Sequence, residues 1–184
     1  DLSILPDFPS GLNSNASSVV AMLEIMRILS KFYENYNSMV HYDILFLLTS
    51  GGALNYQGSN HYINNLDSTL LENLQYVLCL DSLANSENEL FVHLSRYPKP
   101  EDDVSFRLQN SFNSTAENME INLQYKKKKV FLSEKNVPWE HEQYSKKKVL
   151  TSTISGRSEV STNMFDSRFI LDTEVDKKSL KKSI

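Results

Sequence analysis

The sequence predicts an α/β protein, specifically a three-layer αβα sandwich around a mostly parallel central sheet. Two short apolar runs, 44–48 and 76–80, lack polar alternation, which is typical of strands buried on both faces. Segments with helical periodicity precede the first run and separate it from the second. Strands that alternate with helices in this way form a sheet covered by helices on both faces.

Composition favours one folded domain over residues 1–184. A chain of 184 residues that is 40% hydrophobic can bury a substantial core. The net charge of −4 argues against a nucleic-acid-binding domain, whose surface would be basic. No apolar stretch approaches the roughly 20 residues that cross a bilayer. Because the sequence begins at Asp1 and not at methionine, we expect a piece of a longer protein, with targeting and anchoring segments outside it.

The first half of the chain contains the run around which the fold is predicted to form. Residues 1–13 hold two prolines and a glycine and are predicted to be a loop. Apolar residues from Val19 to Phe32 recur every three or four positions, which predicts a helix. The run 44–48 is then the predicted central strand, and the glycines that follow it permit a sharp turn.

The second half gives a weaker pattern with one clear strand. The run 76–80 ends in Asp81 and is predicted to be a second buried strand. The polar stretch 109–118 is predicted to be a surface loop. The remaining predicted elements are short helices at 58–65 and 67–73, a strand near the sheet edge at 89–95, a strand at 130–134, a helical turn at 139–144 and a last strand at 149–154.

The carboxyl end of the first apolar run is where an open α/β sheet normally places its site. The residues there are Gly51, Gly52 and Ala53. None of them has a side chain that could bind a metal, transfer a proton or attack a carbonyl. The expected site therefore lacks catalytic groups at its centre.

Elsewhere the residues that could carry chemistry are scattered. The four histidines show no metal-ligand spacing, so surface or hydrogen-bonded positions are the simpler interpretation. Asp81 is the best single candidate for a site carboxylate, although it could equally cap a neighbouring loop. Cys79 lies in an apolar run and is predicted to be a buried structural thiol. The lysine runs 126–129 and 146–148 could contact anionic headgroups, but solvated loops and strand edges are the commoner explanation.

Two sequence triplets match the acceptor pattern for N-glycosylation. They begin at Asn15 and Asn113. The first lies where a helix is predicted to begin, and the second lies in the predicted polar loop. Asn113 is therefore the better candidate in a lumenal or secreted protein.

Three segments resemble zinc-dependent aminopeptidases of the M28 type, and a fourth resembles a nicastrin-like branch of that family. GLNSNASSVVAMLEIMRIL is similar to the segment that opens the first long helix of that family, where the pattern is G-x-x-D-(D/N)-x-S-G. LFLLTSGGALNYQGSNHYI resembles the next block, an apolar strand followed by E-E-x-G-L-x-G-S. VLCLDSLA resembles the strand that ends in a metal-binding aspartate, and PWEHEQY a later block of the nicastrin-like branch. The resemblance covers about 11–83 and 138–166, and it is weak between 98 and 130.

The resemblance also accounts for the missing chemistry, position by position. The aspartate that bridges the two zinc ions of the active enzymes falls on Ser14. Their general-base glutamate falls on Gly52, and the adjacent ligand glutamate falls on Ala53. The ligand aspartate is retained as Asp81, whereas the last ligand histidine falls near Thr162.

His141 matches a histidine near the site of the active enzymes and is not one of their ligands. A serine hydroxyl stays protonated at neutral pH and cannot bridge two zinc ions. A glycine cannot accept a proton from a bound water. The resemblance therefore implies a pseudoenzyme with no metal or other cofactor.

The resemblance is strongest to a nicastrin-like, non-catalytic branch of this family. It implies the lumenal domain of a glycoprotein of the endoplasmic reticulum membrane, anchored through segments absent from this sequence. The implied partners are a Nodal modulator-like protein and a small multi-pass membrane protein. Together they form the back-of-Sec complex, which joins the translocon in the biogenesis of multi-pass membrane proteins and in receptor assembly. No nucleic acid is among the implied partners.

Two other functions remain open. A substrate receptor of the nicastrin kind would hold a peptide amino terminus in the vacated cleft, with Tyr56, Asp81 and His141 as candidate contacts. A live zinc aminopeptidase would need unorthodox ligands. Peptide binding and metal content distinguish these two functions from the scaffold function.

Overall fold

The computed structural model describes residues 12–35, 42–52, 54–84, 88–99 and 103–160. Its centre is a four-stranded sheet in the order β1-β4-β2-β3. The strands are β1 (Val77–Asp81), β2 (Glu89–Leu94), β3 (Asn122–Lys127) and β4 (Thr151–Ser155). β1 pairs in parallel with β4, β2 pairs in parallel with β3, and β2 and β4 run antiparallel. The prediction of a mostly parallel sheet is confirmed.

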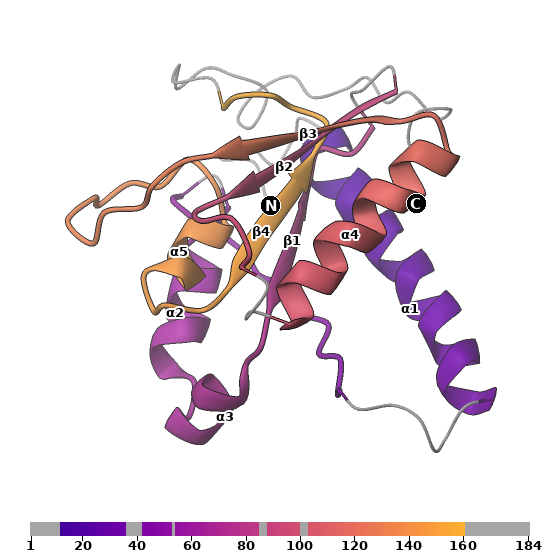
Figure 1. Cartoon of the computed structure of the whole chain (residues 1–184). Coiled ribbons are helices and arrows are strands. Elements are labelled where there is room, and N and C mark those ends of the chain that lie inside the picture. The colour runs from indigo at the N-terminus through magenta and orange to yellow at the C-terminus, as the bar shows by residue number, and fades with distance from the viewer. Residues whose placement is uncertain (1–11, 36–41, 53, 85–87, 100–102, 161–184) are drawn as a thin grey trace.

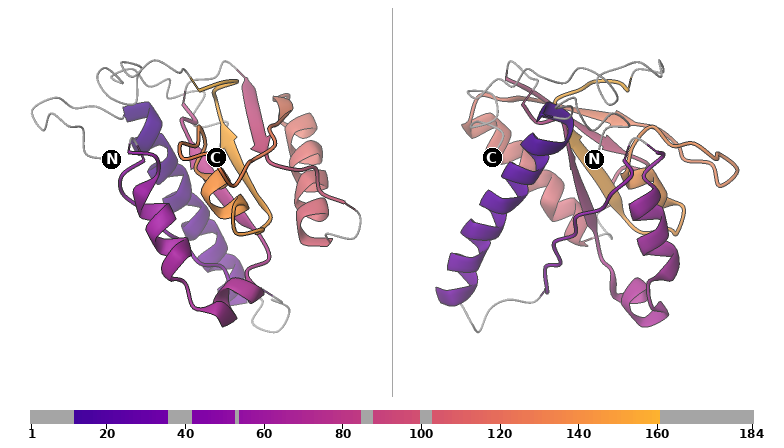
Figure 2. Two further views of the ribbon diagram at one scale, coloured as in Figure 1. Left: turned by 90° about the vertical axis from the view of Figure 1, so that its left-hand side faces the viewer. Right: turned by 180° about the vertical axis from the view of Figure 1, so that it is seen from behind.

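Helices cover both faces of this sheet, as the predicted sandwich requires (Figure 1). One face carries α1 (Ser18–Asn35), which continues from a π-helical turn, η1 (Leu12–Ser17), and α4 (Asp103–Asn118). The other face carries α2 (Gln57–Asn65), α3 (Ser68–Asn73) and α5 (His141–Ser145). The view from behind in Figure 2 shows the same separation.

Alternation along β1 and β4 explains why two separate cores form. Leu80 and Ile154 face α1 and pack with Ala21, Leu83 and Leu90. The residues at odd positions of β1 face the other way, because successive side chains of a strand alternate between faces. They join a second core of Ile63, Cys79 and Tyr144, with Val77 and Val149 packed against it. The prediction that Cys79 is a buried free thiol is confirmed.

The predicted central strand at 44–48 is wrong. Residues 42–49 form no regular element, and Leu45 and Leu48 are 71% and 65% exposed. β1 instead lies at the edge of the described sheet. A strand that is apolar on both faces needs cover on both, and no described helix covers this segment, since the far end of α1 stands away from the sheet (Figures 1 and 2).

Three further predictions are wrong. The stretch 109–118 belongs to α4 and is not a loop, because Ser105, Leu108, Phe112 and Ala116 recur at helical spacing toward the sheet. The stretch 130–134 is not a strand, since β3 has already ended at Lys127. The strand predicted near the edge at 89–95 is the interior strand β2, of which every residue after Glu89 is buried.

The other predicted elements agree with the structure to within a few residues. They are the helices α1, α2 and α3, the turn that contains α5, and the strands β1 and β4. None of the helices that the structure describes combines the length and the hydropathy that a bilayer crossing requires.

Candidate functional site

The candidate site lies where the turn after residue 49 meets α5 and one face of β1 and β4. Gly51 adopts φ +73°, a left-handed conformation that glycine adopts without strain. Its carbonyl accepts hydrogen bonds from the Leu54 and Gln57 amides at 3.0 and 3.2 Å. Gly58 closes the turn by donating to the Ser50 carbonyl at 2.9 Å. The predicted sharp turn at the glycine pair is therefore confirmed.

The turn η1 is fastened to the segment that follows β1. The Ala84 amide donates to Asn13 Oδ1, and the Leu83 amide donates to Ser17 Oγ, both at 3.0 Å. Asn13 and Ser17 are almost fully buried, so these bonds fix η1 against the carboxyl end of β1. The backbone of Ser14 is thereby held beside the strand that ends at Asp81, and the side chain of Ser14 lies outside the described structure.

Asp81 shares a face of β1 with Cys79, because residues two apart on a strand point the same way. Its Oδ1 accepts a hydrogen bond from the Ser82 hydroxyl at 3.1 Å. Ser82 is fully buried and has φ +51°. The chain therefore turns sharply at the end of β1 and keeps the Asp81 carboxylate within the interior polar region that α5 covers.

Glu140, immediately before α5, is the centre of this polar region. Its Oε1 accepts hydrogen bonds from the Ser59 hydroxyl and, at 3.2 Å, from the Thr49 hydroxyl. Thr49 and Ser59 also contact each other at 2.9 Å. Burial raises the pKa of the Glu140 carboxyl, while the two hydroxyls and the nearby Cys79 thiol oppose that rise. Glu140 therefore joins the turn, α2 and β1 through a single carboxylate.

The thiol of Cys79 cannot serve as a nucleophile in this setting. Burial raises its pKa well above the ordinary value, and the neighbouring Glu140 carboxylate raises it further. A thiol becomes nucleophilic as the thiolate, which this environment disfavours. The structure thus supports the interpretation of Cys79 as a core residue.

His141 is the second interior polar group that α5 supplies. It is 1% exposed, and its Nδ1 contacts Thr153 Oγ1 at 2.9 Å. Burial, together with the nearby His93 and Lys128, lowers its pKa to about 3, so the imidazole is neutral at pH 7. Within the described structure its Nε2 has no hydrogen-bond partner. A neutral imidazole with one unsatisfied nitrogen can make one further hydrogen bond to a small polar group.

The structure brings some of the predicted site residues together and leaves others undescribed. Asp81 and His141 lie on the same side of the sheet, with Gly52 in the adjacent turn. Ala53 and Thr162 lie outside the described residues. The hydroxyl of Tyr56 donates to the Pro138 carbonyl at 3.1 Å and so holds the segment before α5 in place. Its hydroxyl is therefore used in a structural contact.

The donor set in the described part of the chain does not fit a zinc centre. Zinc sites in proteins need at least three converging side chains of histidine, cysteine, aspartate or glutamate. No such group of three exists among the described residues. Glu140 is occupied by hydroxyl donors, and the Nδ1 of His141 is occupied by Thr153.

Sequence reasoning missed Glu140, Thr49 and Ser59. The block PWEHEQY indicated that a carboxylate could lie near the site, since it places one glutamate on each side of His141. Glu142, the second of them, is fully buried and contacts Lys128 at 3.1 Å, and so it belongs to a different cluster. The sequence does not distinguish the two carboxylates, whereas their different contacts in the structure do.

The two predicted glycosylation sites fall on helical backbone. Asn113 lies on the exposed side of α4, and its Oδ1 accepts a hydrogen bond from the Tyr125 hydroxyl at 2.7 Å. Asn15 lies in η1 and is half-buried. Glycosylation at either asparagine stays a prediction.

Comparison with known proteins identifies close relatives. Peptidase family M28 matches residues 3–149. The "BOS complex subunit ncln" of Danio rerio is 33% identical over 159 residues, which are 83% of this chain and 27% of that protein. The "BOS complex subunit NCLN" of Gallus gallus is 32% identical over 186 residues, or 93% and 32% of the two chains. "Nicalin" of Caenorhabditis elegans is 27% identical over 169 residues, or 83% and 30%. The chain thus spans about a third or less of each of these relatives.

Solved structures show the same fold. BSAP, a zinc aminopeptidase from Bacillus subtilis, superimposes with a TM-score of 0.66 at 19% identity. The superposition covers 94% of this chain and 39% of the bacterial enzyme. At this identity the likeness establishes the architecture alone, and it agrees with the sandwich described above.

Proposed function

The chain belongs to peptidase family M28, and from that membership we propose that it is a catalytically inactive lumenal domain of nicalin type. In this proposal it works as a docking subunit of the back-of-Sec complex in the endoplasmic reticulum membrane. Its partners are a Nodal modulator-like protein and a small multi-pass membrane protein, and the complex assists the translocon during biogenesis of multi-pass membrane proteins. The observation that carries the proposal is the similarity to BOS complex subunits over 83% to 96% of the chain.

The residues at the site support loss of catalysis. By the family resemblance, Gly52 falls where the active enzymes have their general base, and it lies in the turn that Thr49 and Ser59 flank with hydroxyls. The carboxylate that contacts this turn, that of Glu140, accepts hydrogen bonds from Thr49 and Ser59, which favours a structural role. A base that is already hydrogen-bonded in this way has less capacity to take a proton from water.

An exposed apolar surface supports the docking role. Helix α1 presents large apolar side chains that are 47% to 54% exposed. Contiguous apolar surface on a folded domain is typical of a protein–protein contact. The four side chains of α1 in this docking surface are Val20, Leu23, Ile28 and Phe32.

Capture of the tagged intact protein from detergent-solubilised endoplasmic reticulum membranes tests the proposal. We expect the Nodal modulator-like partner to be recovered with it, and the variant Leu23→Glu/Phe32→Glu to lose that partner. Leu132→Glu is the matched control, since Leu132 is 77% exposed and lies outside the docking surface. Recovery of the intact protein without a Nodal modulator-like partner would reject the proposal.

A second candidate function is a receptor for peptide amino termini. It is favoured by the carboxylates of Asp81 and Glu140 and the unsatisfied Nε2 of His141, which could together accept a primary ammonium group. Fluorescence anisotropy with a labelled peptide tests it, because Asp81→Ala should abolish binding that depends on a free amino terminus. An acetylated peptide that bound equally well would exclude it.

Metal content and turnover address the remaining alternative. Stoichiometric zinc in the purified protein, together with hydrolysis of aminoacyl substrates, would support the hypothesis of an active zinc aminopeptidase. We expect neither, because Asp81 is the sole carboxylate at the positions that match the family's ligands.

A further inference from the structure

The segment between β3 and α5 contains a loop that projects away from the sheet (Figure 1, and the view from behind in Figure 2). Residues 128–136 form this tip loop. It turns at residues 131–134, where the Glu134 amide donates to the Phe131 carbonyl at 3.1 Å. Phe131 and Leu132 stand at the turn and are 51% and 77% exposed. Leu132 is thus the most exposed large apolar side chain among the described residues.

The base of the tip loop is fastened to the rest of the domain on both sides. On the outgoing side, the Lys128 amide donates to the Leu94 carbonyl at the end of β2, at 3.0 Å. On the returning side, Asn55 Nδ2 donates to the Lys135 carbonyl, and the Val137 amide donates to Asn55 Oδ1, both at 2.8 Å. The loop therefore holds its apolar turn out from the sheet, and it has little conformational freedom left to lose on binding.

Lysines flank this apolar turn on both sides. Residues 126–135 contain five lysines and one acidic residue, Glu134. Glu134 pairs with Lys128 at 3.4 Å, and Lys128 also pairs with the buried Glu142 at 3.1 Å, so these three charges are matched within the protein. The lysines that have no such ion pair are exposed, and they are Lys126, Lys127, Lys129 and Lys135.

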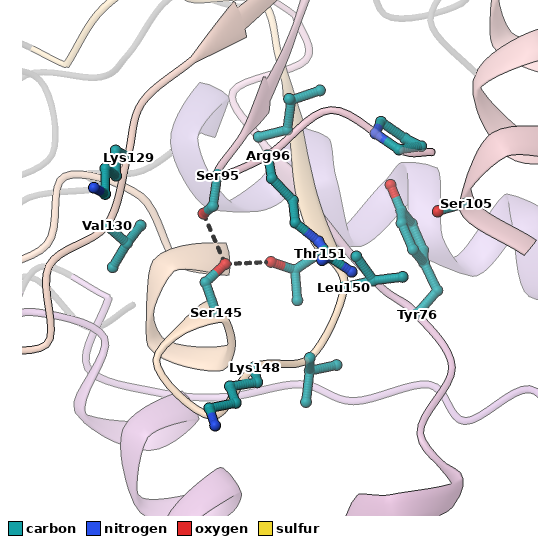
Figure 3. A pocket seen from close by; sticks show the side chains of 13 residues that line it. Tyr76, Ser95, Arg96, Ser105, Lys129, Val130, Ser145, Lys148, Leu150 and Thr151 are labelled. Carbon is teal, nitrogen blue, oxygen red and sulfur yellow. Dashed lines mark hydrogen bonds between the residues drawn. The ribbon is translucent and has the colours of Figure 1, made fainter. Parts of the chain in front are cut away.

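Lys129 joins the basic part of the tip loop to its apolar part. Its Nζ lies 5.4 Å from the centroid of the Phe131 ring, within the range of a cation–π contact. The residue also borders a pocket of about 340 Å³, but its ammonium group points outward, away from Arg96 in that pocket (Figure 3). The ammonium group is therefore placed to contact a surface outside the protein, next to an exposed aromatic ring.

These features fit a bilayer surface better than a protein partner. Two apolar side chains on one turn offer far less area than the roughly 800 Å² that each partner of a stable protein complex buries. Binding to a bilayer instead scales with the apolar area inserted and with the attraction of cations to anionic lipids. The net charge of the chain is −4, so this attraction has to be local. Screening makes it local, because exposed charges more than about 8 Å apart interact little at physiological ionic strength.

We propose that the tip loop binds the surface of an anionic lipid bilayer. Phe131 and Leu132 insert between the headgroups, and the four exposed lysines contact lipid phosphates. Lysine side chains suit this position, because their stems lie along apolar surface while their ammonium groups stay at the charged level. The contact uses neither the candidate site nor the docking surface on α1, so it stands or falls independently of the proposed function.

Sedimentation of the purified 184-residue chain with phosphatidylcholine vesicles, with and without phosphatidylserine, tests the proposal. We expect binding to the acidic vesicles alone, and weaker binding at high salt. Leu132→Glu should weaken binding by at least about tenfold, because it removes inserted apolar area. Leu70→Glu is the matched control: Leu70 is 59% exposed on α3, so this change adds the same charge outside the tip loop and should leave binding nearly unchanged.

A second pair of variants tests the contribution of the lysines. Lys129→Gln should weaken binding to the acidic vesicles by about fivefold, as the loss of one cation near an anionic surface does. Lys31→Gln removes the same charge from an exposed position on α1 and should leave binding unchanged. Circular dichroism of every variant shows whether the fold is kept.

A fluorescent label reports insertion directly. An environment-sensitive dye on the thiol of Leu132→Cys should brighten with acidic vesicles, whereas the same dye on Leu70→Cys should not. Cys79 is buried and does not compete for the dye. Absence of binding to acidic vesicles, or equal losses in Leu132→Glu and Leu70→Glu, would overturn the proposal. Loss of binding in Leu23→Glu/Phe32→Glu with full binding in Leu132→Glu would also overturn it, because the contact would then belong to α1.

Discussion

Replacing Gly58 by alanine sets two physical effects against each other. Gly58 is near the start of α2, where helix propensity alone would make alanine more stabilising than glycine by about 1 kcal/mol. A Cβ at this position, however, would lie 2.4 Å from the Ser50 carbonyl oxygen and 2.7 Å from the Ser50 amide nitrogen. Both contacts are to backbone, so no side chain can rotate away. We take about 3 kcal/mol for this overpacking, at the upper end of the usual range.

We therefore expect Gly58→Ala to lower the free energy of unfolding by about 2 kcal/mol, which is the steric cost minus the gain in helix propensity. For a domain of this size that loss lowers the urea midpoint by about 1 M. The fluorescence of Trp139, the single tryptophan, reports unfolding because it is 5% exposed in the folded chain. Asn64→Ala, on the exposed side of the same helix, should change stability by no more than about 0.5 kcal/mol. A midpoint for Gly58→Ala at or above that of the wild type would refute the close approach of α2 to the turn.

Three further predictions concern buried titratable groups. His141 has a folded-state pKa of about 3, which is below its unfolded value. Its contribution to stability is therefore present above pH 6.5 and is lost as the pH falls toward 3. Between pH 4 and pH 7 the urea midpoint should rise less steeply with pH in His141→Asn than in the wild type. Cys79 should resist alkylation by iodoacetamide in the native state and react fully in urea, since burial raises its pKa and excludes the reagent; rapid native labelling at pH 7 would contradict this. Lys128→Met should lower stability by about 1 to 2 kcal/mol, because it strips the fully buried Glu142 of its ion pair and Lys128 itself is half-exposed. Lys127→Met should leave the thermal midpoint nearly unchanged.

The apolar runs that were correctly predicted as strands are those that the fold covers with helices on both faces. Residues 76–80 and 149–154 pair with each other and are covered by α1, α2 and α5, and both predictions agree with the structure to within a few residues. The segment 44–48 has the same composition, yet its side chains are exposed. An apolar run indicates that its side chains favour burial, but it does not indicate which other element covers them.

Helix α4 shows the opposite failure. Its stretch 109–118 is rich in asparagine and serine, residues that favour turns through local hydrogen bonds. Packing against β3 nevertheless stabilises the helix, and Ala116, at 7% exposed, is the most buried residue of the stretch 109–118. Tertiary packing therefore overrode local propensity.

Much of the candidate site could be predicted from position and little from chemistry. The carboxyl end of a buried strand gave Asp81, and the glycine pair gave the turn. The importance of Glu140 depends on contacts with Thr49 and Ser59, which lie 91 and 81 residues away in the sequence. No local pattern encodes a contact over that separation.

The exposed segment 44–48 and the docking proposal bear on each other. The free energy that favours burial of five consecutive apolar residues is large, roughly 25 cal/mol for each Å² of apolar surface removed from water. β1, the edge strand of the described sheet, offers backbone groups along its outer side, and such edges readily accept another strand. The exposed side chains of segment 44–48, which was wrongly predicted to be a buried strand, would therefore lose much apolar exposure if a partner covered them. A partner that covered segment 44–48 in the complex would remove this exposed apolar surface from water.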